Sequence, residues 1–183
     1  MTVAPQCAGG RLYTGPLFVK YNAVLRGVQQ GANAYLRSRY LELCAMEEVF
    51  ERHKSGDLSW EAATKRANGY TTTIHAINSC IVKSSKLTKA CKVYRGIREM
   101  ALPKKFYTRN AFNVAGGVEP GFMSTTAKRE VAVSYGSGQS GIVFEMQMGM
   151  VDRGADIAWL SQVRQGGSKR SWRMDRRSGV AGS

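Results

Sequence analysis

The sequence predicts an α+β domain in which a helical N-terminal part is followed by a β-rich part. Three observations lead to this expectation. Apolar residues recur at steps of three and four through residues 17–86, short β-rich runs take over from about residue 90, and helices precede strands instead of alternating with them. With 183 residues and an apolar fraction of 43%, the chain is long enough for one domain with a single core.

The helical part is expected over about residues 11–88. The stretch "YLELCAMEEVFERH" follows the helical period, with apolar positions at Tyr40, Leu43, Cys44, Met46 and Phe50, and "SGDLSW" then interrupts it. Ser59 is placed to cap the next helix, and Glu61 suits the first turn of that helix. We expect a second apolar stripe to lie in the core rather than around a ligand; it consists of Ala63, Ala67, Tyr70, Ile74, Ile77 and Ile81.

The β-rich part is expected over about residues 89–162. The runs "CKVYRGI" and "GFMSTT" are typical of short strands. The run "GIVFEMQM" alternates Ile142, Phe144 and Met146 with Val143, Glu145 and Gln147, which places Glu145 outward. Between these runs, "AKREVAVSYG" predicts a helix that ends at Gly136. Residues 1–162 are therefore expected to form one domain. Residues 163–183 carry six Lys and Arg against one Asp, a net charge of +5, and we expect a disordered basic tail there.

The net charge of +14 raises the question of nucleic acid binding. Residues 83–109 hold nine Lys and Arg against Glu99 alone, a net charge of +8. Aromatic residues do not interleave with these cations at the spacing of a base-stacking platform. Positive charge by itself gives only non-specific attraction to phosphates. A basic nucleic-acid-binding protein is therefore only the third alternative for the function, and no specific nucleic acid partner is expected.

Several other classes of protein are not expected. No apolar run approaches the roughly 18 to 20 residues that span a bilayer, and the N-terminus has no signal-peptide pattern, so we expect a cytoplasmic protein without a membrane partner. The four cysteines form no C-x-x-C pair and are expected to be free thiols, with a contact between Cys80 and Cys91 as the alternative. Neither His53 nor His75 has a second histidine or a cysteine at helical spacing, so no metal site is expected.

Arg95 stands inside the short apolar run "VYRGI". An unpaired buried charge is costly, so Arg95 either faces water on an edge strand or points into a cleft. In a cleft, the planar guanidinium would suit a phosphate or a carboxylate. Gly96, which follows directly, would let a ligand approach the backbone.

Three consecutive hydroxyls end the run "GFMSTT", and these are Ser124, Thr125 and Thr126. A hydroxyl at this place can cap the helix that is expected to begin near Ala127. A cap accounts for one hydroxyl and not easily for three. The others could orient a carboxylate or a ribose.

Taken together, "VYRG", "GFMSTT", "REVAVSYG", "GIVFEM" and "GADIAWLS" resemble the arginine-specific mono-ADP-ribosyltransferases of the R-S-E class. The order and spacing of all five pieces match over residues 93–161, and "YTGPLFVKYNAVLR" is similar to the entry segment of that family. The resemblance implies a mixed or antiparallel β-sheet core that binds NAD. It also implies transfer of ADP-ribose from NAD to an arginine of an acceptor protein or of a small guanidine, with release of nicotinamide; NADP in place of NAD is left open.

The resemblance assigns roles to five residues. Arg95 would brace the NAD phosphates, and Gly96 would hold the nicotinamide carboxamide with its backbone. Ser124 begins the segment that corresponds to the S-T-S motif of the family, in which this chain has Thr126 at the third position. Ser124 would orient the catalytic glutamate and the nicotinamide ribose, with Thr125 beside it in the cofactor site. Tyr135 falls where the family commonly places a ring against nicotinamide, although a core tyrosine on the helix is an equal alternative.

The third element of the family, an E-x-E or Q-x-E pair that supplies the catalytic glutamate, is missing. Its place reads "VRQGGSKRSW", and no Glu occurs after Glu145. The family pattern is therefore truncated or altered at its C-terminal end, and the sheet is expected to be incomplete there. We expect an ADP-ribosyltransferase domain that has little or no activity as it stands. The alternative is a non-catalytic module that binds NAD or a protein.

Overall fold

The computed structural model describes residues 4–149 and 154–162. Within these ranges the chain forms eight α-helices, one short 3-10 helix and one sheet of two antiparallel strands. The fold is therefore mixed α+β, with the helices first, as the sequence predicts. The expectation of a disordered tail concerns residues 163–183, which lie outside the described residues.

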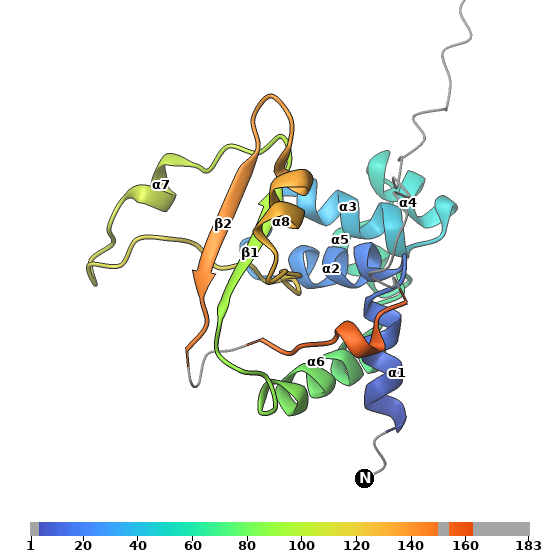
Figure 1. Cartoon of the computed structure of the whole chain (residues 1–183). Coiled ribbons are helices and arrows are strands. Elements are labelled where there is room, and N and C mark those ends of the chain that lie inside the picture. Colours follow the sequence, from blue (N-terminus) through green and yellow to red (C-terminus); the bar gives the residue numbers. More distant parts are fainter. Residues whose placement is uncertain (1–3, 150–153, 163–183) are drawn as a thin grey trace, which may run out of the picture.

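Six helices make up the N-terminal part, which lies to one side of the strands (Figure 1). They are α1 (Ala4–Tyr13), α2 (Phe18–Gly27), α3 (Ala34–Cys44), α4 (Glu47–Lys54), α5 (Trp60–Thr64) and α6 (Thr71–Ser85). The helical part thus begins at Ala4, earlier than the start near residue 11 that the sequence predicts. A propensity argument misses α1 because "CAGG" contains two poor helix formers.

Close contact with α6 explains why α1 forms despite its glycines. A Cβ atom on Gly9 would lie 2.8 Å from the backbone carbon of Ala76, so only glycine lets the two helices approach this closely. Tyr13 at the end of α1 is buried together with Tyr21 and Ile77. The apolar surface buried between the helices therefore outweighs the weak local propensity.

The stretch "YLELCAMEEVFERH" forms two helices where its period predicts one. The chain is extended at Ala45 and Met46, and the break turns α4 so that Val49 reaches Leu41 and Ala63 in a buried cluster. The second stripe is divided in the same way, because Tyr70 adopts a left-handed conformation between α5 and α6.

The predicted assignment of the second stripe to the core is confirmed, with Ala63 and Ile77 fully buried and its other members half-buried. The first stripe is buried only in part, because Tyr40 and Cys44 are buried whereas Met46 is 67% exposed. The predicted cap is confirmed as well, since the Ser59 hydroxyl accepts a hydrogen bond of 3.3 Å from the Ala62 N–H.

The sheet pairs β1 (Lys92–Ile97) with β2 (Ile142–Gln147) in antiparallel register, with Arg95 opposite Phe144 and Gly96 opposite Val143. Two helices separate the strands in sequence: α7 (Lys104–Tyr107) and α8 (Arg129–Gly136), of which α8 packs on β1. The predicted alternation in β2 is confirmed, because Ile142, Phe144 and Met146 are less exposed than their neighbours.

The run "GFMSTT" does not form the predicted strand. Only Thr126 pairs with β1, through two hydrogen bonds with Tyr94 of 2.8 and 2.9 Å. Residues 121–124 instead turn toward the helical part, because their backbone groups bind side chains from α1 and α2. This departure from sheet geometry creates the candidate site described next.

Candidate functional site

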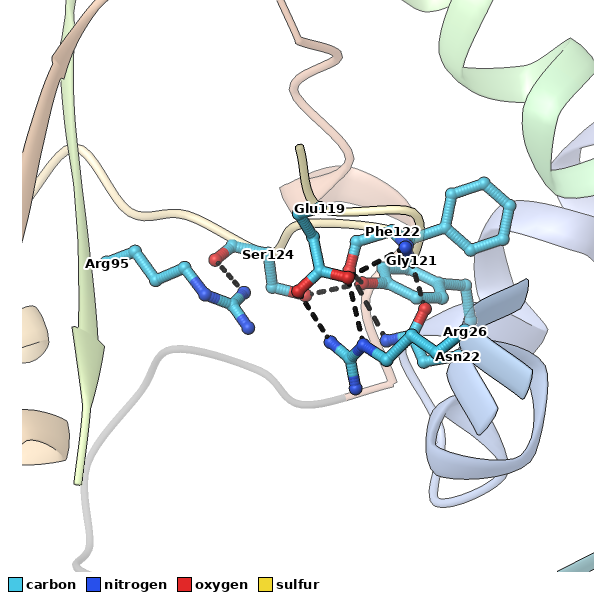
Figure 2. A network of polar contacts seen from close by, with 8 residues as sticks. Asn22, Arg26, Arg95, Glu119, Gly121, Phe122 and Ser124 are labelled. Atoms are coloured by element: carbon cyan, nitrogen blue, oxygen red, sulfur yellow. Dashed lines mark hydrogen bonds and ion pairs between the residues drawn. The ribbon is translucent and has the colours of Figure 1, made fainter. Parts of the chain in front are cut away.

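The side chain of Arg95 reaches from β1 to the segment that contains the three hydroxyls. Its Nη1 donates a hydrogen bond of 2.8 Å to the backbone carbonyl of Ser124, as Figure 2 shows. Arg95 is half-buried and directed to a fixed partner rather than simply exposed on an edge strand. The two residues that the sequence singles out most strongly are therefore in contact.

The hydroxyl of Ser124 lies 2.7 Å from the hydroxyl of Tyr13, at the C-terminal end of α1. The Tyr13 hydroxyl is also 3.1 Å from the Phe122 carbonyl oxygen, to which it can donate. The C-terminal end of α1 thus positions the Ser124 side chain. Of the other two hydroxyls, Thr126 accepts from the Lys128 N–H at 3.1 Å and so supports the turn before α8, whereas Thr125 is exposed.

Asn22 on α2 holds the neighbouring backbone in place. Its side chain is 5% exposed, accepts from the Phe122 N–H at 2.8 Å and donates to the Phe122 carbonyl at 3.3 Å. A buried polar side chain is stable only when its hydrogen bonds are made, and this one makes two with a single residue 100 positions away. Sequence reasoning did not assign Asn22 a role, although a lone amide in the apolar run of α2 was a signal for one.

Glu119 is the carboxylate that the structure brings to this cluster, and sequence reasoning missed it. Its two oxygens accept from Nε and Nη2 of Arg26, each at 2.9 Å, and Oε1 also accepts from the Gly121 N–H at 2.8 Å. Burial alone would raise the pKa of the Glu119 carboxyl. The hydrogen bonds from Arg26 and Gly121, together with the charges of Arg26 and Arg95, outweigh it and lower that pKa below 4.5.

The electrostatic balance of the cluster is positive. Arg26 and Arg95 supply two guanidinium groups against the single carboxylate of Glu119. Because that carboxylate already accepts three hydrogen bonds, it is held as a structural ion pair and has little capacity left to stabilise a reacting cation. The site is better suited to an anion than to a cation.

Gly96 is required by the packing of α8. A Cβ atom at this position would overlap the carbonyl oxygen of Ala132. The backbone of Gly96 also has a defined direction, because Tyr94 bonds to Thr126 and alternate residues of a strand direct their N–H and C=O to the same edge. These groups of Gly96 therefore point away from β2, toward the side on which residues 124–126 lie.

Tyr135 is 64% exposed on α8, so the alternative of a core tyrosine is wrong.

Glu145 faces outward as predicted. Its Oε1 lies 2.7 Å from Nζ of Lys92, so its carboxylate is paired there and not with the residues around Arg95 and Ser124. Of the later carboxylates, Asp156 accepts from the Ala158 N–H at 2.9 Å, whereas Asp152 and Asp175 lie outside the described residues.

A separate hollow of about 430 Å³ opens on the helical part. It is lined by residues of the loop before α3 and of α3, α4 and α5, which are Ala32, Ala34, Arg37, Ser38, Phe50, His53, Lys54 and Trp60. None of the residues that the sequence predicts for the site lies there. Across residues 4–149 and 154–162, no group of three His, Cys, Asp or Glu side chains is placed to hold a metal ion.

Comparison with known proteins does not place the chain in a family: no family model, no curated protein and no solved structure matches it. In the described part of the chain, no helix is both long and apolar enough to cross a bilayer. The functional assignment therefore depends on the geometry of the residues around Arg95 and Ser124.

Proposed function

We propose that the chain binds NAD at the cluster around Arg95 and Ser124, as an ADP-ribosyltransferase-like domain of the arginine-specific R-S-E class. The contact between the Arg95 guanidinium and the Ser124 carbonyl is the single observation that carries this proposal. It joins two residues 29 positions apart that the motif resemblance assigns independently to the same cofactor.

The charge of the cluster supports a phosphate-bearing ligand. A guanidinium has five N–H donors, and the Ser124 carbonyl accepts from one of them. The remaining donors of Arg95 form the planar fork that suits a diphosphate. Because Arg26 is neutralised by Glu119, Arg95 is the cation that would supply this attraction.

Two further features suit the nicotinamide end of the cofactor. The backbone of Gly96 directs an N–H and a C=O to the side of residues 124–126, which is the pairing that a carboxamide needs. The Ser124 hydroxyl, held by Tyr13, would lie against the ribose. Thr125 and Tyr135 are both exposed and stay candidates for contact with the cofactor.

Transferase activity needs a carboxylate held against the ribose while positive charge develops there. Glu119 is committed to Arg26, Glu145 is paired with Lys92, and no Glu follows Glu145 in the sequence. This observation favours the second candidate function, a module that binds NAD without turning it over. If turnover occurs, the acceptor is an arginine of a protein or of a small guanidine.

Calorimetric titration with NAD tests the binding proposal. Arg95→Ala is expected to weaken NAD binding at least tenfold, and Arg95→Lys should recover little of it, because a point charge does not replace a planar fork. Arg98→Ala is the matched control, since Arg98 is an exposed cation three positions further on. Equal affinities of the Arg95→Ala and Arg98→Ala variants, or no heat with the unaltered chain, would refute the proposal.

Nicotinamide release and arginine labelling separate the two candidate functions. The unaltered chain is compared with one whose residues after Gln162 are replaced by a segment that bears E-x-E. The missing carboxylate is expected to cost about 100- to 1,000-fold in rate. Equal turnover by the two chains would show that a carboxylate already present performs the reaction.

A further inference from the structure

Residues 100–118 form an arm that leaves β1 near Arg95 and returns at Glu119. Figure 1 shows this arm, with α7 inside it, projecting beyond β2 on the side away from the helical part. Phe106 attaches the arm to the sheet, because the centroid of its ring lies 6.3 Å from that of the Phe144 ring in β2. The same ring packs on the returning half of the arm, since a Cβ atom on Gly117 would be 3.4 Å from Phe106 Cδ2.

The far end of the arm is held in one conformation by its own hydrogen bonds. The Asn110 side chain accepts from the N–H groups of Phe112 and Val114 at 2.9 and 3.0 Å, and the Asn110 N–H donates to the Val114 carbonyl at 2.9 Å. Arg109 closes the turn through a hydrogen bond of 2.8 Å from Nη1 to the Asn113 carbonyl. A compact turn is therefore built around Phe112.

This turn and its neighbours present apolar side chains to solvent. Phe112 is 85% exposed and Val118 is 88% exposed, and Tyr107 and Val114 are also well exposed. An isolated exposed apolar residue is normal on a protein surface, but several on one short segment indicate a contact surface. Here the hydrogen bonds of Asn110 fix an aromatic ring outside the core.

Positive charge surrounds these apolar side chains. Lys104, Lys105 and Arg109 lie on the arm, and the sequence has no Asp or Glu between Glu99 and Glu119. The arm therefore carries a net charge of +3 from these three cations. Both lysines are exposed and form no salt bridge within the described residues.

We propose that this arm docks onto an anionic lipid membrane surface, in contrast to the expectation from sequence that the chain has no membrane partner. Exposed aromatic and aliphatic side chains beside lysines and arginines have the chemistry of the bilayer interface, where the apolar groups enter the headgroup region and the cations meet anionic lipids. Single-stranded nucleic acid fits less well. Phe112 and Tyr107 carry exposed rings, but Val114 and Val118 offer none for a base to stack on, and the Phe106 ring packs on Phe144. The proposal does not depend on NAD binding.

Sedimentation with vesicles tests it. The full chain is mixed with vesicles of phosphatidylcholine and phosphatidylserine at 7:3, and with vesicles of phosphatidylcholine alone. We expect binding to the mixed vesicles that weakens as salt is raised, and at least tenfold weaker binding to the neutral ones. Phe112→Ser with Val118→Ser should lower the partition coefficient on the mixed vesicles about tenfold or more.

Two matched controls locate the effect on the arm. Leu87→Ser changes a side chain that is equally exposed, at 88%, and also lies among lysines, between Lys86 and Lys89, but outside the arm. It should alter binding less than twofold. Lys104→Gln with Lys105→Gln should weaken binding about fivefold for each cation. The adjacent exposed cations Lys65 and Arg66, changed to Gln together, should have a much smaller effect. Circular dichroism melts confirm that each variant folds.

Insertion is measured directly by the tryptophan fluorescence of the Phe112→Trp variant. On adding the mixed vesicles, its emission maximum should shift to the blue by more than that of the unaltered chain, which has three tryptophans of its own. Three results would each overturn the proposal. These are no binding to the mixed vesicles, equal losses for the arm and control variants, and binding of a labelled oligothymidylate that the arm variants abolish while vesicles are ignored. The last result would assign the arm to single-stranded nucleic acid.

Discussion

Arg26 and Glu119 are joined by two hydrogen bonds of 2.9 Å, from Nε to Oε1 and from Nη2 to Oε2. This pair links α2 to the segment that leads into Ser124, across 93 positions of sequence. Both side chains are largely shielded from water, with 31% and 26% exposure. A bidentate pair in this setting fixes the position of the backbone that Arg95 contacts.

The first prediction concerns the stability that this pair supplies. Glu119→Gln is expected to lower the free energy of unfolding by about 2 kcal/mol, because the partly buried Arg26 loses its charged partner. The matched control is Glu42→Gln, since Glu42 pairs with Arg39 at 2.8 Å on an exposed helix surface, with exposures of 47% and 40%. That change should cost about 0.5 kcal/mol or less. Urea denaturation measures both, and equal losses would contradict this account of the pair.

The second prediction is the pH dependence of the same contribution. The pKa of the Glu119 carboxyl is lower in the folded chain than its ordinary value of 4.5. The folded state therefore binds this proton less readily than the unfolded state, so the stability is present above about pH 4.5 and is lost as the pH falls through the folded pKa. The difference in unfolding free energy between the unaltered chain and Glu119→Gln should shrink between pH 6 and pH 3. A difference that does not change with pH would show that the carboxylate charge is not responsible.

The third prediction concerns thiol reactivity. Burial raises the pKa of the Cys44 thiol to about 11, although the charge of Lys20 acts in the opposite direction. Since the thiolate is the reactive form, Cys44 should resist iodoacetamide at pH 8 while the exposed Cys91 is labelled. Peptide mass spectrometry gives the two rates separately. In urea the rates should become similar, and a rapidly labelled Cys44 in the native chain would contradict the buried position.

The fourth prediction tests the approach of α1 to α6. Gly9→Ala improves helix propensity by about 1 kcal/mol, but its new methyl group would meet the Ala76 backbone at 2.8 Å. Forced overpacking of this kind typically costs about 1 to 3 kcal/mol. We therefore expect a net loss of stability, measured by urea denaturation. Gly69→Ala is the control, because its nearest neighbour, the Thr71 hydroxyl, is at an ordinary 3.5 Å.

The sequence by itself determined the fold class and the periodic part of the core. The second apolar stripe predicts that Ala63 and Ile77 are buried, and they are. The alternation in "GIVFEMQM" likewise predicts that Glu145 faces outward. These features follow from local periodicity, which needs no knowledge of distant residues. Arg95 and Ser124 could also be chosen from sequence, since a charge in an apolar strand and a run of hydroxyls are unusual in themselves.

Only the tertiary structure decided which residues join them. Asn22 bonds to Phe122 and Arg26 bonds to Glu119, each across about 100 positions of sequence, and nothing in the local sequence of either pair predicts the contact. The break at Ala45, the helix at Ala4–Tyr13 and the loss of the strand at residues 121–124 have the same origin. In each case long-range packing or hydrogen bonding outweighs a local preference, because one buried contact is worth as much as the propensities of several residues.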